Sequence, residues 1–228
     1  METQIQIITE KQKAKLVKSL PKFLKSKRKA LEKQFGKEKT ERILNVASEV
    51  YPNIVNVTPT FKSAMYDGLV GLASKLAALK KGMRAADIST EEFVKFNIEQ
   101  TRKNSSKVPG FLKKLGGKIY LSSLMRIYLK RVAKTVTVNG WPTNLINGTS
   151  KDDYAMSIET HDCQMVAFWK SVGEGDIKPY CSFFDFSAAE VLGLGLKQIS
   201  DYDSGVCKYC FYKKGKVEWP NAIKSIIN

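Results

Sequence analysis

The residues best suited to chemistry lie in the last third of the chain. All four cysteines, Cys163, Cys181, Cys207 and Cys210, and the single histidine, His161, fall there. Thiols in this number serve as metal ligands, as reactive nucleophiles or as small apolar groups in a core. A disulfide scaffold is not expected in an intracellular chain of this size. Three interpretations of the cysteines therefore stay open.

Cys207 and Cys210 form a CxxC pair within residues 206–212, which we expect to be a strand. Successive side chains of a strand point to opposite faces, so Cys207 and Cys210 should face opposite ways. This geometry argues against both thiols binding one metal ion. Zinc prefers four nitrogen or sulfur ligands. We expect no metal and no cofactor, and the alternative is a zinc site made of His161, Cys163, Cys207 and Cys210.

His161 and Cys163 are separated by one residue and would share a face of an extended strand. An imidazole next to a thiol lowers the pKa of the thiol and acts as its base. The competing interpretation is a histidine exposed at a strand end. A second pairing of reactive groups lies in residues 179–190, where Cys181 and Asp185 flank aromatic side chains that include Phe184. These groups could line a pocket, although Asp185 could instead cap the helix that follows.

The segment that contains Cys163, Cys181, Asp185 and Cys207 resembles the C-terminal region of the L-2-amino-thiazoline-4-carboxylic acid hydrolase family. That family has a cysteine after a strand, a second cysteine with an aspartate close behind, and a third cysteine in a strand near a glycine. The resemblance covers about residues 155–215. Two features depart from the family pattern: the spacing of Cys181 and Asp185 is longer by one residue, and Cys210 is an additional thiol.

The resemblance implies a hydrolase that opens a cyclic amidine, a thiazoline-carboxylate-like small molecule, at a C–N bond. Either a cysteine thiolate attacks the amidine carbon, or a carboxylate or imidazole activates water. The resemblance also implies an α+β fold like that of small-molecule-binding domains with a vinyl-reductase-like core. The catalytic residues that we expect are Cys181, Asp185, Cys163 and His161, and those expected to contact substrate are Cys207, Tyr209 and Phe184.

Charge is the second strong signal of the sequence. The formal net charge is +16, and residues 11–42 alone hold thirteen basic and three acidic residues. Such a surface attracts nucleic acid, acidic lipid or anionic metabolites. A solvated helix face is the stronger explanation of the lysines, and the segment has no recognised nucleic-acid-binding motif. We therefore expect a small anionic metabolite as partner rather than nucleic acid, and we leave homo-oligomerisation open.

Helical spacing of apolar residues organises the first part of the chain. It predicts two or three helices within residues 8–50, interrupted at Pro21 and Gly36, and a break over residues 51–60. Thr60 is expected to cap the next helix and Gly82 to end it. The run from Ser89 to Glu92 is a capping box and predicts a helix to about residue 102. Residues 104–117 should be a loop or short helix, and residues 118–134 an amphipathic helix.

Beyond residue 133 the spacing changes to that of strands and short helices. We expect strands at 136–138, 154–160, 197–202 and 206–212, and short helices at 164–172, 187–194 and 219–227. The fold class is therefore α+β: an N-terminal helical region packed with a small antiparallel sheet and short helices.

We place a lysine-rich helical region at 1–110 and a cysteine-bearing region at 111–228, joined in one compact body. No apolar run is long enough to span a membrane. Met1–Gln4 lead into lysines rather than an apolar segment, so we expect a cytoplasmic protein.

Overall fold

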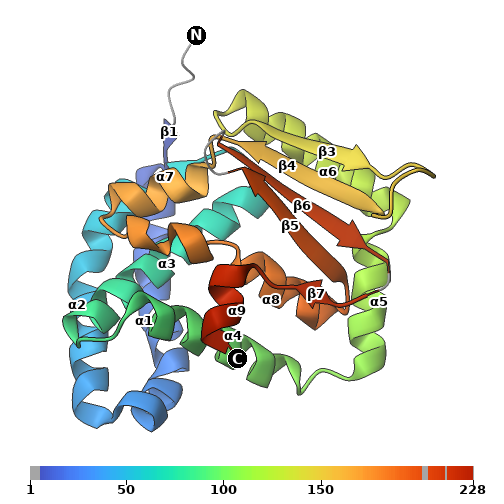
Figure 1. Ribbon diagram of the computed structural model, residues 1–228. Helices are drawn as coiled ribbons and strands as arrows, with labels where there is room; N and C mark the ends of the chain where they lie inside the picture. The colour runs from blue at the N-terminus through green and yellow to red at the C-terminus, as the bar shows by residue number, and fades with distance from the viewer. Residues whose placement is uncertain (1–5, 202–204, 214, 228) are drawn as a thin grey trace. The chain divides into compact units, whose positions relative to one another are not determined.

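The computed structural model describes residues 6–201, 205–213 and 215–227 of the 228-residue chain. Two sequence predictions, one about the stretch Met1–Gln4 and one about a strand end at Tyr202, concern residues outside this part. The chain divides into two compact units: unit 1 comprises Met1–Phe93 and Gln164–Lys178, and unit 2 comprises Val94–Cys163 and Pro179–Asn228. Helices dominate unit 1 and a five-stranded sheet lies in unit 2, so the fold class is α+β as predicted (Figure 1).

Unit 1 is a helical body with one two-residue strand pair. Its elements are β1 (Gln6–Ile7), α1 (Glu10–Phe35), α2 (Lys37–Asn56), β2 (Pro59–Thr60), α3 (Ala64–Ala85), the first turn of α4 (Thr90–Ser105), α7 (Gln164–Ser171) and most of the 3-10 helix η1 (Gly175–Tyr180).

α1 begins at a capping box, because Thr9 accepts a hydrogen bond from the Gln12 amide and the Gln12 side chain accepts one from the Thr9 amide. It runs through Pro21 without interruption and ends at Gly36, whose φ of 80° suits glycine. Proline removes only one hydrogen-bond donor, and the buried leucines of α1 hold the helix on either side. The predicted break at Pro21 is therefore wrong, and the one at Gly36 is confirmed.

Three further predictions about unit 1 are corrected. Pro52 lies inside α2, flanked by buried residues that hold the helix together, so the break is shorter than expected. Thr60 belongs to β2 and its hydroxyl donates to the Asp67 carboxylate, whereas Ser63 occupies the N-cap position of α3. α3 also continues past Gly82. A Cβ at Gly82 would lie 2.2 Å from the Ile43 carbonyl oxygen, so this glycine lets α2 and α3 approach closely.

Residues 164–178 belong to unit 1, which moves the division of the chain away from the expected boundary at residue 110. Glu174 and Asp176 hold this segment in unit 1, because both accept hydrogen bonds from Lys80 of α3. The other end of unit 1 falls inside α4, between Phe93 and Val94. The capping box at the start of α4 is confirmed, since the Glu92 carboxylate accepts from the Ser89 amide and the Ser89 hydroxyl from the Glu92 amide.

Unit 2 combines helices with a sheet of strand order β3-β4-β6-β5-β7. Its elements are the rest of α4, α5 (Gly110–Tyr120), α6 (Ser123–Val138), β3 (Thr143–Asn147), β4 (Met156–His161), α8 (Phe183–Leu192), β5 (Gly195–Asp201), β6 (Val206–Tyr212), β7 (Val217–Glu218) and α9 (Asn221–Ile227).

The sheet is mixed rather than purely antiparallel, because β7 pairs with β5 in parallel. The other described pairings in this sheet are antiparallel. The strand expected at residues 136–138 is instead the end of α6. Leu129, Val132 and Val136 are buried at spacings of three and four, and this helical stripe outweighs the short alternation of two valines. α6 packs along β3, behind the sheet in the view of Figure 1.

α8 packs against α5 and β5 on the side of the sheet that carries Tyr209. Close approach of α5 and α8 depends on Gly117, where an added Cβ would lie 2.5 Å from the Leu192 carbonyl oxygen. Phe186 is fully buried and contacts two rings: its centroid lies 6.4 Å from that of Tyr209 and 5.4 Å from that of Trp219. This aromatic packing fixes the first turn of α8 over the sheet.

Candidate functional site

The register of the sheet places Cys207 and Tyr209 on one face. Cys207 pairs with Thr160 and Ser200, and Tyr209 pairs with Ile158 and Gln198, across β4 and β5. Directly paired residues in a sheet share a face. Cys210 is two positions from Lys208 and faces the other way, as predicted from the CxxC spacing.

Polar side chains of β5 contact the Cys207 sulfur. Gln198 donates from Nε2 to Cys207 Sγ at 3.3 Å, and Ser200 donates from Oγ at 3.4 Å. Burial raises the pKa of the Cys207 thiol, although these donors and Tyr209 work in the opposite direction. Sequence reasoning missed Gln198 and Ser200. Their positions at i and i+2 of a strand, which put both side chains on one face, were the available signal.

α8 brings Asp185 to the same face of the sheet. The Tyr209 side chain is hydrogen-bonded to the Asp185 carboxyl group. Burial nevertheless raises the pKa of Asp185 from its ordinary 3.8 to about 6. Among the described residues, no lysine or arginine forms an ion pair with Asp185. A carboxylate that is partly desolvated and has no cation keeps a raised pKa for that reason.

Asp185 remains open to solvent even though protein surrounds it closely enough to shift its pKa. Its neighbour Phe184 is half-buried and stacks on Phe183 at a centroid distance of 4.1 Å. Asp185 stands in the first turn of α8, where a carboxylate is favoured by the helix dipole, but the N-cap position belongs to Ser182. A small molecule can therefore reach this carboxylate, and Phe184 lies beside it in sequence.

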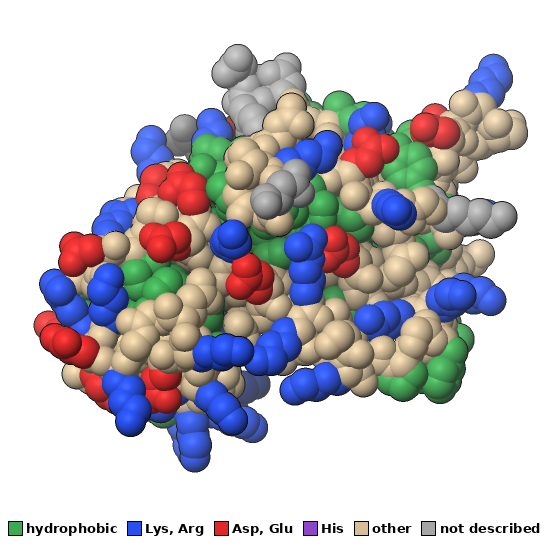
Figure 2. Space-filling model, turned by 60° about the horizontal axis from the view of Figure 1, so that its bottom comes forward, with side chains coloured by type: hydrophobic (Ala, Val, Ile, Leu, Met, Phe, Trp, Pro, Cys, Tyr) green, Lys and Arg blue, Asp and Glu red, His purple; other side chains and the backbone are tan. Residues whose placement is uncertain are grey.

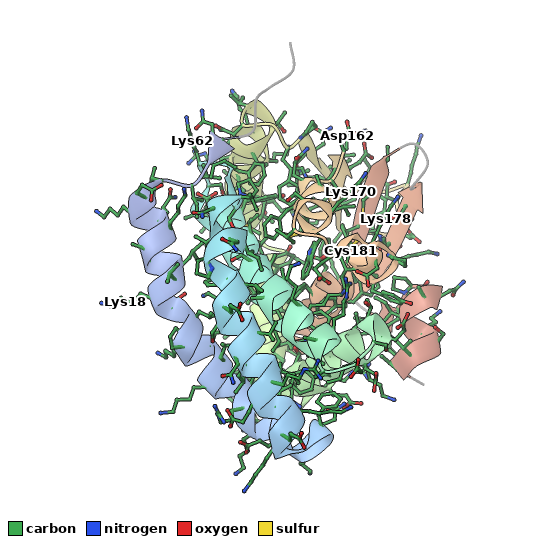
Figure 3. The ribbon with its side chains drawn as sticks, turned by 90° about the vertical axis from the view of Figure 1, so that its left-hand side faces the viewer. Lys18, Lys62, Asp162, Lys170, Lys178 and Cys181 are labelled. Carbon is green, nitrogen blue, oxygen red and sulfur yellow. The ribbon has the colours of Figure 1, made fainter. Side chains whose placement is uncertain are left out.

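Cys181 and Cys163 complete the group. Burial raises the pKa of the Cys181 thiol well above its ordinary value, and the proximity of Cys163, Cys207 and Asp185 raises it further. Burial also raises the pKa of Tyr209 well above its ordinary value. Cys181, labelled in Figure 3, is therefore a neutral thiol at neutral pH. We call Cys163, Cys181, Asp185, Cys207 and Tyr209 the Asp185 cluster.

His161 lies apart from the Asp185 cluster. β4 ends at His161, whose side chain lies on the opposite face of the sheet from Cys207 and pairs with Glu159 at 3.1 Å. The next residue, Asp162, has a φ of 47°, so the chain turns before Cys163. The assumption that His161 and Cys163 extend along one strand is therefore incorrect. The turn carries Cys163 into the cluster and leaves the histidine outside it.

The alternative zinc site does not assemble. Among the described residues, no group of three or more histidine, cysteine, aspartate or glutamate side chains has the geometry to hold a metal ion. Two of the four ligands required for the zinc alternative, Cys207 and Cys210, lie on opposite faces of the sheet. His161 is paired with Glu159 on the face opposite Cys207.

A cavity in unit 2 has a volume of about 470 Å³. Its wall includes Arg102, which binds both carboxylate oxygens of Glu190 and lies over the Trp219 ring at 5.4 Å. Glu190 also accepts a hydrogen bond from Trp219. Burial alone would raise the pKa of Glu190, but these bonds lower it. None of the residues of the Asp185 cluster lines this cavity, so it is a separate feature.

Comparison with known proteins adds no neighbour to these observations. The resemblance of residues 155–215 to the thiazoline hydrolase family therefore stays a prediction, and a functional assignment has to start from the Asp185 cluster. No family model matches the chain, no curated protein matches it, and no solved structure matches its fold.

Proposed function

We propose that unit 2 binds a small cyclic amidine and hydrolyses one of its C–N bonds, with Asp185 as the acid–base residue. The observation that supports this proposal is the convergence of Asp185, Tyr209 and three cysteines from separate segments of unit 2. Active sites gather a few polar groups of shifted pKa in this manner.

The charge of Asp185 indicates the class of substrate. A partly desolvated carboxylate without a cation gains most from a ligand that supplies one. A protonated cyclic amidine is planar and carries two N–H groups that match the two carboxylate oxygens. Partial burial strengthens that pairing compared with bulk water. Thiols and Phe184 provide the apolar surroundings that a thiazoline ring prefers.

The reaction proceeds by addition of water and loss of the ring nitrogen. Asp185 takes a proton from water while the water oxygen forms a bond to the amidine carbon. The protonated Asp185 then delivers this proton to the ring nitrogen as the C–N bond breaks. The hydroxyl group of the adduct gives its remaining proton to the released nitrogen as a carbonyl forms at the former amidine carbon, so the opened chain carries an ammonium group. Atoms and charge balance with water as the sole co-reactant.

Water is a better nucleophile in this mechanism than a cysteine. The pKa of the Cys181 thiol is raised well above its ordinary value, so little thiolate exists at neutral pH. An aspartate with a pKa of about 6 is ionised at neutral pH and acts as a base. Cys181 and Cys163 then act as neutral groups that contact substrate, as do Cys207 and Tyr209.

The test is hydrolysis of 2-amino-thiazoline-4-carboxylate by the full chain, followed by mass spectrometry of the ring-opened product. Asp185→Asn should lower kcat/KM by about 10²-fold or more, since general acid–base catalysis contributes on this scale. Cys181→Ser should lower it by less than about tenfold, because a hydroxyl keeps the polar contact. Asp153→Asn, in the loop before β4, is the matched control and should leave the rate unchanged.

Two results would contradict parts of this proposal. Turnover that survives in Asp185→Asn but disappears in Cys181→Ser, together with a covalent adduct on Cys181, would replace the water mechanism with a thiolate mechanism. Amidinium binding measured by calorimetry without any turnover would leave a ligand-binding module instead of a hydrolase.

The dependence of the rate on pH gives an independent measurement. With Asp185 as base, kcat/KM should rise as pH increases through about 6 and then level off. A rate that keeps rising above pH 8 would point to a thiolate, because the cysteine pKa values are raised.

A further inference from the structure

The two consecutive helices α5 and α6 expose an unusual amount of apolar surface. Most exposed large hydrophobic side chains of the described residues lie between positions 108 and 138. Phe111 is 69% exposed, Leu115 50% and Leu124 79%. Single exposed hydrophobic residues are ordinary, but a run of them along two helices is not. The set comprises Val108, Phe111, Leu112, Leu115, Ile119, Leu124, Ile127, Tyr128 and Val138.

These residues form stripes that are separate from the sides of the helices that pack on unit 2. On α5, Phe111, Leu115 and Ile119 recur at every fourth position, whereas Gly116 and Gly117 approach Leu192. On α6, the exposed Leu124, Ile127 and Tyr128 differ from the buried stripe of Leu129, Val132 and Val136. Each helix therefore has one apolar side for its own core and another that the unit leaves uncovered.

The same region carries only positive side-chain charge. Between Glu99 and Asp152 the sequence has eleven lysines and arginines and no aspartate or glutamate. Seven of them lie on α5 and α6: Lys113, Lys114, Lys118, Arg126, Lys130, Arg131 and Lys134. None of these seven forms an ion pair within the described part of the chain. Figure 2 shows hydrophobic side chains at the surface next to lysine and arginine side chains.

We propose that the exposed face of α5 and α6 binds the surface of an anionic lipid bilayer. Leucine, isoleucine and phenylalanine enter the boundary between headgroups and acyl chains, while lysines and arginines at the edge contact acidic headgroups. Tyr128 is suited to the same interface, because its ring is apolar and its hydroxyl is polar. Contact with the bilayer is peripheral, since none of the described helices is both long and apolar enough to cross it.

Charge decides between the bilayer and other occupants of this face. A second copy of the chain would bring the same seven cations together across a two-fold axis, with no acidic residue of this stretch to compensate them. Nucleic acid would satisfy the cations but would leave the leucines and Phe111 without apolar contacts. An acidic bilayer complements both the charge and the apolar side chains.

The lysines of α1 provide an internal comparison. α1 is also rich in lysine, and Lys18 points away from the helix in Figure 3. Val17 is the only large hydrophobic residue of α1 in the exposed set of the described residues. If electrostatic attraction alone held the protein to the bilayer, α1 would contribute to binding as much as α5 and α6. Insertion of apolar side chains into the bilayer requires α5 and α6.

The experiment is flotation of the full chain with vesicles of phosphatidylcholine alone or with about 30 mol% phosphatidylglycerol. Binding is expected to the acidic vesicles only, and it should weaken as salt rises. The variant Leu115→Gln with Leu124→Gln should bind at least about tenfold more weakly, with an unchanged circular dichroism spectrum. The matched control replaces two exposed leucines of α3, Leu69→Gln with Leu72→Gln, and should bind normally.

A second pair of variants separates the helix face from net charge. Lys114→Gln with Lys118→Gln should weaken binding by about thirtyfold, because each lysine near an acidic surface contributes roughly 1 kcal/mol. Lys18→Gln with Lys22→Gln removes the same charge from α1 and should have little effect.

Three outcomes would overturn the proposal: no binding to acidic vesicles at low salt, equal losses in test and control pairs, or a dimer that dissociates in the leucine variant. The dimer would assign this face to a second copy of the chain.

Discussion

Two carboxylates, the buried Glu174 in unit 1 and the solvent-accessible Asp185 in unit 2, have opposite surroundings. The Glu174 side chain is 1% exposed and contacts Lys80 at 2.5 Å, Arg84 at 2.8 Å and Lys81 at 3.7 Å. Asp185 has the Tyr209 hydroxyl and no cation among the described residues. A buried carboxylate that is paired with cations holds elements together, whereas a carboxylate without a cation favours a cationic ligand. The comparison therefore separates a structural carboxylate from the one that we propose binds a ligand.

The Glu174 network also involves Asp176 and Thr90. Lys80 and Arg84 each bond Asp176, and the Thr90 hydroxyl donates to it as well. Burial alone would raise the pKa of Asp176, but its bonds to Lys80 and Thr90 lower it. Lys80 is 2% exposed in its side chain, so its charge depends on these partners.

The largest expected effect comes from removing the paired carboxylate. Glu174→Ala should lower the free energy of unfolding by about 3 kcal/mol, because Lys80 would remain buried with half of its partners. Urea denaturation followed by circular dichroism measures this loss. Lys81→Gln, at a partly exposed cation of the same network, is the control and should cost much less. A loss below about 1 kcal/mol for Glu174→Ala would show that the network is not a structural element.

Removing the half-exposed ion pair of Arg102 and Glu190 should lower the free energy of unfolding by an intermediate amount. The Arg102 side chain is 41% exposed and that of Glu190 is 28% exposed. Arg102→Met keeps most of the packing over Trp219 and removes the ion pair, so it should cost about 1 kcal/mol. The same denaturation experiment measures it. A cost equal to that of Glu174→Ala would mean that exposure does not govern these pairs.

Removing the charge of Asp185, which has no cationic partner among the described residues, should raise the stability rather than lower it. Because the pKa of Asp185 is raised to about 6, its stabilising contribution is complete below pH 3.8 and is lost as pH rises through about 6. Asp185→Asn has no charge to lose. At pH 7.5 the variant should therefore melt about 2 °C higher than the parent chain, and the difference should vanish near pH 3.5. A lower melting temperature at pH 7.5 would contradict the absence of a cation.

The smallest effect is expected at the surface. Lys197 and Glu218 lie 3.7 Å apart with side chains that are 49% and 64% exposed. Glu218→Gln should change the free energy of unfolding by less than about 0.5 kcal/mol and should lose even that at high salt. A larger change in the denaturation midpoint would indicate a role for β7 that its exposure does not suggest.

Much of the local structure could be predicted because it depends on near neighbours. The capping box of Ser89 and Glu92, the α7 helix, and the strand that separates Cys207 from Cys210 all follow from spacings within a few residues. The failures at Pro21, Pro52 and Gly82 share a cause. At each position, packing of the surrounding helix outweighs the local preference of the residue.

The sequence by itself determined the α+β class, the strands β4, β5 and β6 of the last third and the presence of reactive groups there. Only the tertiary structure decided which groups meet. The turn at Asp162 separates Cys163 from His161, and pairing of β5 with β6 brings Gln198 and Ser200 to the Cys207 sulfur. The sequence also contained no indication that Glu174 would have cationic partners and that Asp185 would have none among the described residues. Whether a carboxylate finds a cation depends on residues almost a hundred positions away, and local spacing carries no information about them.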